Sequence, residues 1–295
     1  MEIIKPKIIV ILGPTSSGKS DVAVSMAKKF NGEIISADSR QVYKGMDLGT
    51  GKITKKEMLG IPHYLLDVAN PKTIFSVEKY KKLAEKKIEE ILKKNKTPII
   101  CGGTGFYIDS IVKNILLPQV KPNKKLRKEL ENKTTEELYR TLQKLSPSRA
   151  QNIDSKNRVR LIRAIEIAKA LGKVPEVKEL PSKYEFILIG IDLPDEILKE
   201  RIKIRLQKRL KAGMLKEVQK LKKDGVSWKR LESFGLEYRN CALFLQNKIS
   251  KEQMIQNIEK ESFQYVKRQR TWFRRNKNIK WFGNNKRDIL NHLLK

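Results

Sequence analysis

The sequence predicts an α/β fold, in which a parallel sheet is flanked by helices and interrupted by an all-α insertion. Three observations support this class. Short, continuous apolar runs alternate with amphipathic helical patterns, as is typical of parallel strands that are buried on both faces. A glycine-bounded loop directly follows the first apolar run. Between about residues 114 and 182 the apolar runs stop, and the chain becomes polar and helical.

The strands are expected where the apolar runs lie. They are Lys7–Leu12, Glu33–Ala37, Pro98–Cys101, Phe186–Asp192 and, at an edge of the sheet, Ile279–Phe282. One helix is expected to begin after Ser76, a good N-cap residue, and a long last helix is expected from about Ser250. The apolar stripe of the first of these helices consists of Val77, Tyr80, Leu83, Ala84, Ile88, Ile91 and Leu92.

Proline-bearing stretches bracket the polar helical segment, so the chain is expected to divide into three parts. Residues 1–113 begin the core, residues 114–184 form the helical insertion, and residues 185–295 complete the core with the C-terminal helices. The two cysteines, Cys101 and Cys241, lack the spacing of a zinc site and are expected in the core. No apolar run approaches the ~20 residues that span a bilayer, and no signal peptide is recognisable, so a cytoplasmic protein without membrane contact is expected.

The loop after the first strand matches a phosphate-binding motif. Gly13, Gly18, Lys19 and Ser20 fit G-x-x-x-x-G-K-[ST], which predicts a P-loop NTPase-like core. In such a loop successive N–H groups point at a phosphate, the lysine neutralises oxygens, and the hydroxyl of Ser20 is a ligand for Mg²⁺. The residues expected to bind a diphosphate are Gly13, Pro14, Thr15, Ser16, Ser17, Gly18, Lys19 and Ser20. The motif does not by itself select the reaction.

Candidate catalytic and binding residues follow two further strands. Asp38 follows the second strand, at the edge where open α/β sheets bind their ligands. It suits a kinase, as a proton acceptor or Mg²⁺ ligand, and it equally suits another transferase, as the general base for a nucleophile. The polar run Asp38, Ser39, Arg40 and Gln41 is of the kind that recognises bases. After the third strand, glycines around Thr104 allow a close backbone approach, and the aspartate of a standard Walker B site is missing.

Basic residues dominate the charge of the chain. A net charge of +31 favours a polyanionic partner, although part of the excess is ordinary for a lysine-rich surface. Arg201, Arg205 and Arg209 recur on one helix face, which either faces phosphates or is solvated, and Arg205 is the preferred phosphate ligand. The last helix interleaves basic and aromatic residues, which suits nucleic-acid binding. These residues are Tyr265, Lys267, Arg268, Arg270, Trp272, Phe273, Arg274 and Arg275.

With these residues in view, the chain resembles the tRNA dimethylallyltransferases over nearly its whole length. The matching segments, in order, are GPTSSGKS, SADSRQVYKGMDLGTGK, IPHYLLDVANP, GGTGFYI, NRVRLIRAIEI, GIDLPDEILKERI and KRQRTWFRR. The family transfers a dimethylallyl group from its diphosphate to N6 of the adenosine next to the anticodon, with Mg²⁺, in tRNAs that read codons starting with U. The resemblance implies dimethylallyl diphosphate and tRNA as substrates, for which a monomer suffices.

The resemblance also implies roles for individual residues. The catalytic residues would be Asp38 as general base, Thr104 against the RNA, and Arg205 on the diphosphate. The tRNA-binding residues would be Asp38, Ser39, Arg40, Gln41, Thr104, Arg158, Phe234, Gly235, Lys267, Arg268, Gln269, Arg270 and Arg274. Arg158 belongs to the helical insertion, which would clasp the anticodon stem. One segment departs from the family pattern, because Leu236 follows Gly235 where a tyrosine is common.

Two other functions remain open at this point. A P-loop kinase of a small molecule or nucleotide explains the phosphate loop, but it explains neither the charge nor the basic and aromatic last helix. A non-catalytic RNA-binding P-loop protein explains the charge, but it leaves Asp38 without a task.

Overall fold

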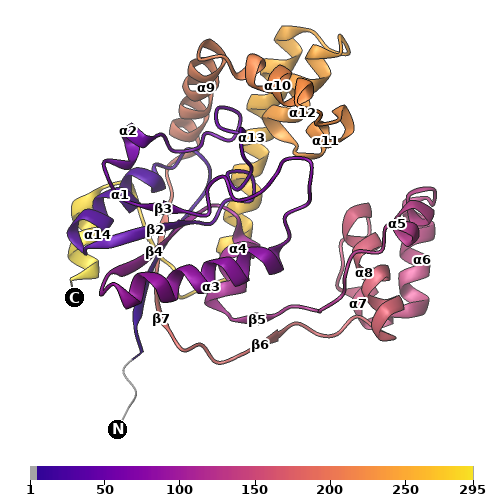
Figure 1. The fold of residues 1–295 in the computed structure, drawn as a ribbon, viewed down its shortest axis with the longest axis horizontal. Coiled ribbons are helices and arrows are strands. Elements are labelled where there is room, and N and C mark those ends of the chain that lie inside the picture. Colours follow the sequence, from indigo (N-terminus) through magenta and orange to yellow (C-terminus); the bar gives the residue numbers. More distant parts are fainter. Residues whose placement is uncertain (1–4, 295) are drawn as a thin grey trace. The chain divides into compact units, whose positions relative to one another are not determined.

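The computed structural model describes residues 5–294, which form two compact units. The first unit extends to Asn114 and resumes at Pro181, and the second unit is Ile115–Leu180. The first contains a parallel sheet of six strands in the order β3-β2-β4-β1-β7-β8 (Figure 1). Its strands are β1 (Lys7–Leu12), β2 (Gly32–Ser36), β3 (His63–Tyr64), β4 (Thr97–Gly102), β7 (Glu185–Ile191) and β8 (Lys280–Phe282).

The strands predicted from apolar runs are confirmed, each within one residue at either end. β8 lies at an edge of the sheet, as expected. β3 was not predicted, because it has only two residues, both half-buried, and pairs with Ile34 and Ile35 of β2. The register aligns Leu12 of β1 with Gly102 of β4, and Ser36 of β2 with Cys101. The loops after these three strands therefore emerge at one edge of the sheet.

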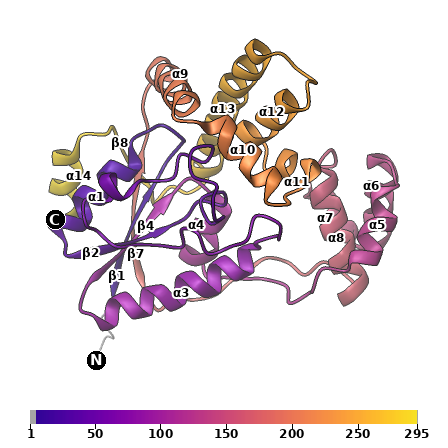
Figure 2. The ribbon, with the colours of Figure 1, turned by 45° about the horizontal axis from the view of Figure 1, so that its top comes forward.

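Alternate residues of β1 face two separate cores. Ile8 and Val10 pack on one face of the sheet, whereas Ile9 and Ile11 pack on the other. The first core includes residues of α3 (Val77–Lys93), α4 (Gly105–Val112) and α13 (Lys251–Phe273), and the second includes residues of α1 (Lys19–Lys29) and α14 (Lys286–Leu293). Figure 2 shows α1 and α14 on one side of the sheet and α3 and α4 on the other. The alternation explains why the strand is apolar throughout.

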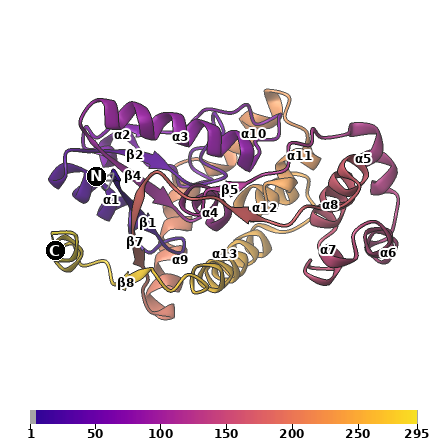
Figure 3. The ribbon, with the colours of Figure 1, turned by 90° about the horizontal axis from the view of Figure 1, so that it is seen from below.

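The helix predictions are largely confirmed. Ser76 caps α3 by accepting a hydrogen bond from Lys79 N, and Ser250 caps α13 with a capping box to Gln253. The prediction that Leu83 belongs to the buried stripe of α3 is wrong, because this side chain is 37% exposed. Tyr80 of the same stripe is fully buried. The remaining helices of this unit are α2 (Lys55–Met58), α9 (Asp195–Lys211), α10 (Met214–Lys223), α11 (Trp228–Ser233) and α12 (Leu236–Leu245). Helices α9 and α13 are neighbours (Figure 3). Leu198 and Ile202 of α9 pack against Val266 of α13.

The second unit has its own apolar core. It contains α5 (Lys124–Glu131), α6 (Thr135–Leu145), α7 (Pro147–Gln151) and α8 (Arg158–Leu171). Leu138, Leu142 and Leu161 are fully buried among these helices. An antiparallel ribbon of β5 (Ile115–Leu116) and β6 (Lys178–Glu179) joins the start of the unit to its end. The insertion is therefore helical with a short ribbon, not purely α as predicted.

Both cysteines are buried and unpaired, as expected for core residues. Burial raises the pKa of the Cys101 thiol to about 11 and that of Cys241 to about 12, so neither is an activated nucleophile. Among residues 5–294, no helix combines the length and the apolar character that crossing a membrane requires.

Candidate active site

The loop Gly13–Ser20 joins β1 to α1 and has the backbone of a phosphate cradle. Gly13 has a φ of 151°, and a Cβ there would lie 2.2 Å from the carbonyl oxygen of Ile191 in β7, so only glycine fits. Gly18 precedes α1, and the first N–H groups of that helix have no partner within the helix. The Ser17 hydroxyl is fully buried and has no hydrogen-bond partner in the described part of the chain. The loop thus offers polar hydrogens to an oxyanion.

Lys19 is a half-buried cation in this loop. Its ammonium group donates to the carbonyl oxygen of Pro14 at 3.1 Å and forms no ion pair within residues 5–294. Burial lowers the pKa of Lys19, the charge of Arg205 adds to this effect, and the charge of Asp38 opposes it. Lys19, Asp38 and Arg205 therefore lie within electrostatic reach of one another. A bound anion would stabilise the charged lysine by supplying the counter-charge that it lacks.

Asp38 is held in a fixed orientation at the carboxyl end of β2. Its Oδ1 accepts hydrogen bonds from the backbone N–H groups of Arg40, at 2.8 Å, and Gln41, at 3.3 Å. This Asx turn reverses the chain directly after the strand. Within the described residues, Oδ2 accepts no hydrogen bond. One carboxylate oxygen thus holds the loop, and the other is available for chemistry.

Thr104 joins the end of β4 to the Asp38 loop. Its N–H donates to the carbonyl oxygen of Ala37 at 3.1 Å, and its Oγ1 accepts from the N–H of Ser39 at 2.9 Å. Thr104 is also the N-cap residue of α4, but its side chain does not cap that helix. The side chain instead holds Ser39, the neighbour of Asp38, in place.

Tyr265 of α13 was expected only as an aromatic residue of the basic last helix, and not as a residue near Asp38. Burial raises the pKa of Tyr265 to about 12, and the charge of Asp38 adds to the effect, while Arg40 and a hydrogen bond with Thr104 oppose it. The phenol therefore faces the same groups as the predicted catalytic residues. Its place in a basic and aromatic helix was the only available signal.

The three arginines of α9 face the loops of this edge. Arg201 donates to the carbonyl oxygens of Ser16 and Ser17, both at 3.4 Å. Arg209 forms an ion pair with Glu237 at 2.9 Å. Arg205 lies between them in the sequence, and packing around its guanidinium and the charge of Arg209 lower its pKa. The stripe thus faces the phosphate loop, and Arg201, which was not among the predicted site residues, contacts that loop directly.

Several side chains that were predicted to bind tRNA instead make contacts within the protein. Phe234 is buried, and the guanidinium of Arg40 lies 5.6 Å from the centre of its ring. Gln41 donates to the carbonyl oxygen of Gly51 at 3.3 Å. Gln269 is buried, and Arg270 is paired with Asp192, just after β7, and with Asp195, at the start of α9.

The other predicted tRNA-binding residues are placed differently. Lys267, Arg268 and Arg274 are exposed on and just after the last turns of α13. Gly235 precedes α12 with a φ of 73°. Arg158 belongs to the second unit, where it donates to two backbone carbonyl oxygens at 2.6 and 3.1 Å.

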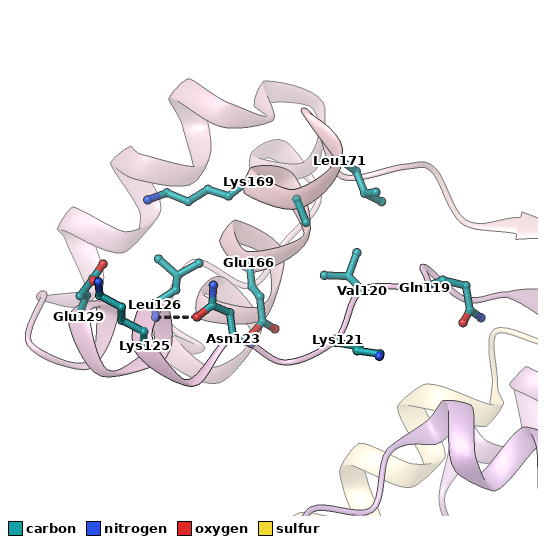
Figure 4. A pocket seen from close by; sticks show the side chains of 11 residues that line it. Gln119, Val120, Lys121, Asn123, Lys125, Leu126, Glu129, Glu166, Lys169 and Leu171 are labelled. Atoms are coloured by element: carbon teal, nitrogen blue, oxygen red, sulfur yellow. Dashed lines mark hydrogen bonds between the residues drawn. The ribbon is translucent and has the colours of Figure 1, made fainter.

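A cavity of about 600 Å³ lies in the second unit (Figure 4). Lys121, Lys125 and Lys169 line it beside Glu166. Burial alone would raise the pKa of Glu166, but hydrogen bonds from Arg127 and other donors lower it. The carboxylate is therefore already satisfied by the protein, and the cavity contains none of the predicted catalytic residues.

Comparisons with known proteins agree on one family. A family model described as IPP transferase matches residues 41–276. The chain is 43% identical over 276 residues to "tRNA dimethylallyltransferase 2" of Treponema denticola, covering 92% of each chain. It is 40% identical over 294 residues to a tRNA dimethylallyltransferase of Staphylococcus epidermidis, covering 96% of this chain and 88% of that protein.

Solved structures agree with these relatives. A tRNA isopentenylpyrophosphate transferase from Bacillus halodurans matches with a TM-score of 0.74 at 34% identity, covering 98% of this chain and 96% of the other. A eukaryotic dimethylallyltransferase acting on tRNA matches with a TM-score of 0.74, covering 91% of this chain and 70% of the other. At 24% identity, the second match shows the fold only.

Proposed function

Since this chain belongs to the IPP transferase family, we propose a prenyl transfer at the sheet edge that carries Asp38 and the phosphate loop. Relatives named tRNA dimethylallyltransferase support a tRNA-modifying prenyltransferase. The proposed reaction transfers a dimethylallyl group from dimethylallyl diphosphate to N6 of the adenosine next to the anticodon. The observation that supports this chemistry best is the convergence of Lys19, Asp38 and Thr104 on the loops after β1, β2 and β4.

The phosphate loop is proposed to hold the leaving group. When the allylic C–O bond breaks, its electron pair and the negative charge move to the diphosphate. The free N–H groups at the start of α1 and the ammonium group of Lys19 stabilise that charge where it develops. Arg205 and Arg201 approach the same loop from α9 and add positive charge.

Asp38 is proposed as the general base. The exocyclic amine of adenine is a weak nucleophile, so removal of its proton as the N–C bond forms assists the reaction. Oδ1 is engaged with Arg40 N and Gln41 N, which orients the carboxylate, and Oδ2 takes the proton from N6. The products are the alkylated adenosine, diphosphate and a protonated Asp38.

We propose Mg²⁺ as the metal, with the Ser20 hydroxyl as its protein ligand. Among the described residues, no group of three or more His, Cys, Asp or Glu side chains forms a metal cage. Mg²⁺ does not require one, because it keeps several waters and binds through substrate phosphates and few protein oxygens. Ser20 is exposed at the start of α1 beside the cradle, which fits this mode. When bound, the ion neutralises charge on the diphosphate.

The acceptor is proposed to bind through exposed cations. Lys267, Arg268 and Arg274 are available for phosphates at the end of α13, and the second unit, with Arg158, is proposed to hold the anticodon stem. The target base is flipped out of its stack to reach Asp38. Because tRNA is the acceptor, the proposed location is the cytoplasm, and a monomer suffices because one chain carries all these groups.

Incubation with radiolabelled dimethylallyl diphosphate and unmodified tRNA tests this function. We expect Mg²⁺-dependent incorporation of label into tRNAs that read codons starting with U. We expect no comparable ATP turnover. Robust ATP hydrolysis without label in tRNA would instead support a P-loop kinase.

A further inference from the structure

Gln269 is a buried amide of α13 that connects two loops of the active edge. Its Oε1 accepts a hydrogen bond from the backbone N–H of Thr15 at 2.9 Å, and its Nε2 donates to the carbonyl oxygen of Gly103 at 2.8 Å. The residue is only 5% exposed. Both hydrogen-bonding ends of the side chain are therefore used inside the protein.

The two loops are those that carry the chemistry. Thr15 belongs to the cradle for the diphosphate, and Gly103 immediately precedes Thr104, which holds Ser39 beside Asp38. A Cβ at Gly103 would lie 2.3 Å from Nε2 of Gln269, so the amide fits only because this position is glycine. The side chain of Gln269 is thus built into the place where the leaving-group site meets the base.

The neighbours of Gln269 on α13 divide into two faces. Lys267 and Arg268 are exposed. Arg270, like Gln269, faces inward, where it pairs with Asp192 at 2.8 Å and also with Asp195. Sequence position within the basic run therefore does not decide which residues meet RNA.

We propose that Gln269 is a positioning residue for prenyl transfer and not a tRNA contact. Its amide holds Thr15 and Gly103 at a fixed separation, so that the diphosphate cradle and the Asp38 loop keep the distance that in-line transfer requires. Reactions between two bound substrates are sensitive to such distances, and a displacement of about 1 Å costs roughly 100-fold in rate. The inference rests on the proposed function.

The test compares Gln269→Met with a matched control at an exposed position of the same helix, Lys260→Met. Methionine keeps the volume and the burial at position 269 but removes both hydrogen bonds. For Gln269→Met we expect kcat for prenyl transfer to fall about 10- to 100-fold, with tRNA affinity and its salt dependence unchanged. For Lys260→Met, which lies outside the proposed site, we expect the parental kcat together with the parental tRNA affinity and salt slope.

A second variant approaches the amide from the other side. Gly103→Ala places a methyl group against Nε2 of Gln269, which would displace the amide, and should reproduce the loss in kcat. If both substitutions act through the amide of Gln269, kcat of the double variant is no lower than kcat of the slower single variant. This cycle remains informative even if Gln269→Met lowers the melting temperature.

Three outcomes would overturn the inference. One is a parental kcat in both Gln269→Met and Gly103→Ala. Another is additive losses in the double variant, and the third is a weaker, less salt-dependent tRNA binding in Gln269→Met, which would make Gln269 an RNA contact. Failure of the parent to label tRNA would refute the proposed function instead, and calorimetric binding of inorganic diphosphate to each variant tests the cradle independently of that activity.

Discussion

The Oγ1 of Thr104 accepts a hydrogen bond from the backbone N–H of Ser39 at 2.9 Å, which ties the loop after β4 to the loop after β2. Ser39 directly follows Asp38, whose Oδ1 accepts from Arg40 N and Gln41 N. The proposed base is therefore held from both sides, by its own turn and by the neighbouring strand end. This arrangement separates residues that do chemistry from residues that hold them.

Replacing Asp38 by asparagine should separate catalysis from binding. Asparagine keeps an oxygen for the Asx turn to Arg40 N and Gln41 N but cannot take a proton from N6. We expect kcat to fall about 10²–10⁴-fold with tRNA affinity nearly unchanged, measured by single-turnover labelling and filter binding. Asp38→Ala, which also removes the turn, should lose activity at least as severely. A comparable loss of tRNA affinity in Asp38→Asn would mean that the carboxylate is structural.

Thr104→Val should slow the reaction by loosening the Asp38 loop. Valine matches the shape of threonine but leaves Ser39 N without its acceptor. We expect kcat to fall about tenfold and the free energy of unfolding to fall by about 1 kcal/mol. Thr104→Ser keeps the hydroxyl and is the control, and it should retain most of the parental kcat. A loss in Thr104→Ser together with a parental kcat in Thr104→Val would show that the methyl group, not the hydrogen bond, matters.

Arg201→Gln should weaken binding of the donor substrate. Arg201 is the arginine of α9 that contacts carbonyl oxygens of the phosphate loop, so its charge adjoins the proposed diphosphate site. We expect the KM for dimethylallyl diphosphate to rise about tenfold, which corresponds to one charge-assisted hydrogen bond. Lys203→Gln, at an exposed position of the same helix, is the control and should leave KM unchanged. Equal effects of both variants would indicate only a general loss of positive charge.

Local patterns in the sequence account for most of the first unit. The apolar runs predicted β1 and its neighbours because parallel strands buried on both faces must be apolar throughout. β3 was missed because His63 and Tyr64 are half-buried and form a strand only through pairing with β2. The P-loop was recognisable because its spacing follows from backbone geometry alone.

The placement of the candidate residues was predictable at strand ends, but not along α13. Asp38 and Thr104 follow strands, and the carboxyl ends of parallel strands meet at one edge. The direction of a side chain on α13 instead depends on distant partners, as Arg270 depends on Asp192 and Gln269 on Thr15. The basic run therefore could not reveal which residues of the helix are buried.

Glu33 should contribute stability that depends on pH. Burial alone would raise the pKa of Glu33, but hydrogen bonds from Lys96, Tyr64 and Lys94 outweigh this effect and lower it to about 2. The pKa of Glu33 in the folded protein lies below its ordinary value of 4.5. The contribution of Glu33 to the free energy of unfolding is therefore complete above about pH 4.5 and is lost as the pH falls toward 2. The difference in unfolding free energy between the parent and Glu33→Gln, from urea titrations, should shrink across this window. A difference that stays constant from pH 7 to pH 3 would contradict the assignment.

Arg270→Ala should affect stability more than RNA binding. Although Arg270 lies in the basic run, its guanidinium is paired with Asp192 and Asp195 and donates to the carbonyl oxygen of Leu193 at 2.5 Å. Its removal takes the cationic partner from Asp192, just after β7, and from Asp195, at the start of α9, so we expect the melting temperature to fall by roughly 3–6 °C. The salt slope of tRNA binding should remain that of the parent, because no phosphate contact is removed.

Arg268→Ala, on the exposed face, is the matched control: it should lower the slope by about one while the melting temperature changes little. A lower slope in Arg270→Ala, with an unchanged melting temperature, would place this arginine on the RNA and leave the aspartates to another role.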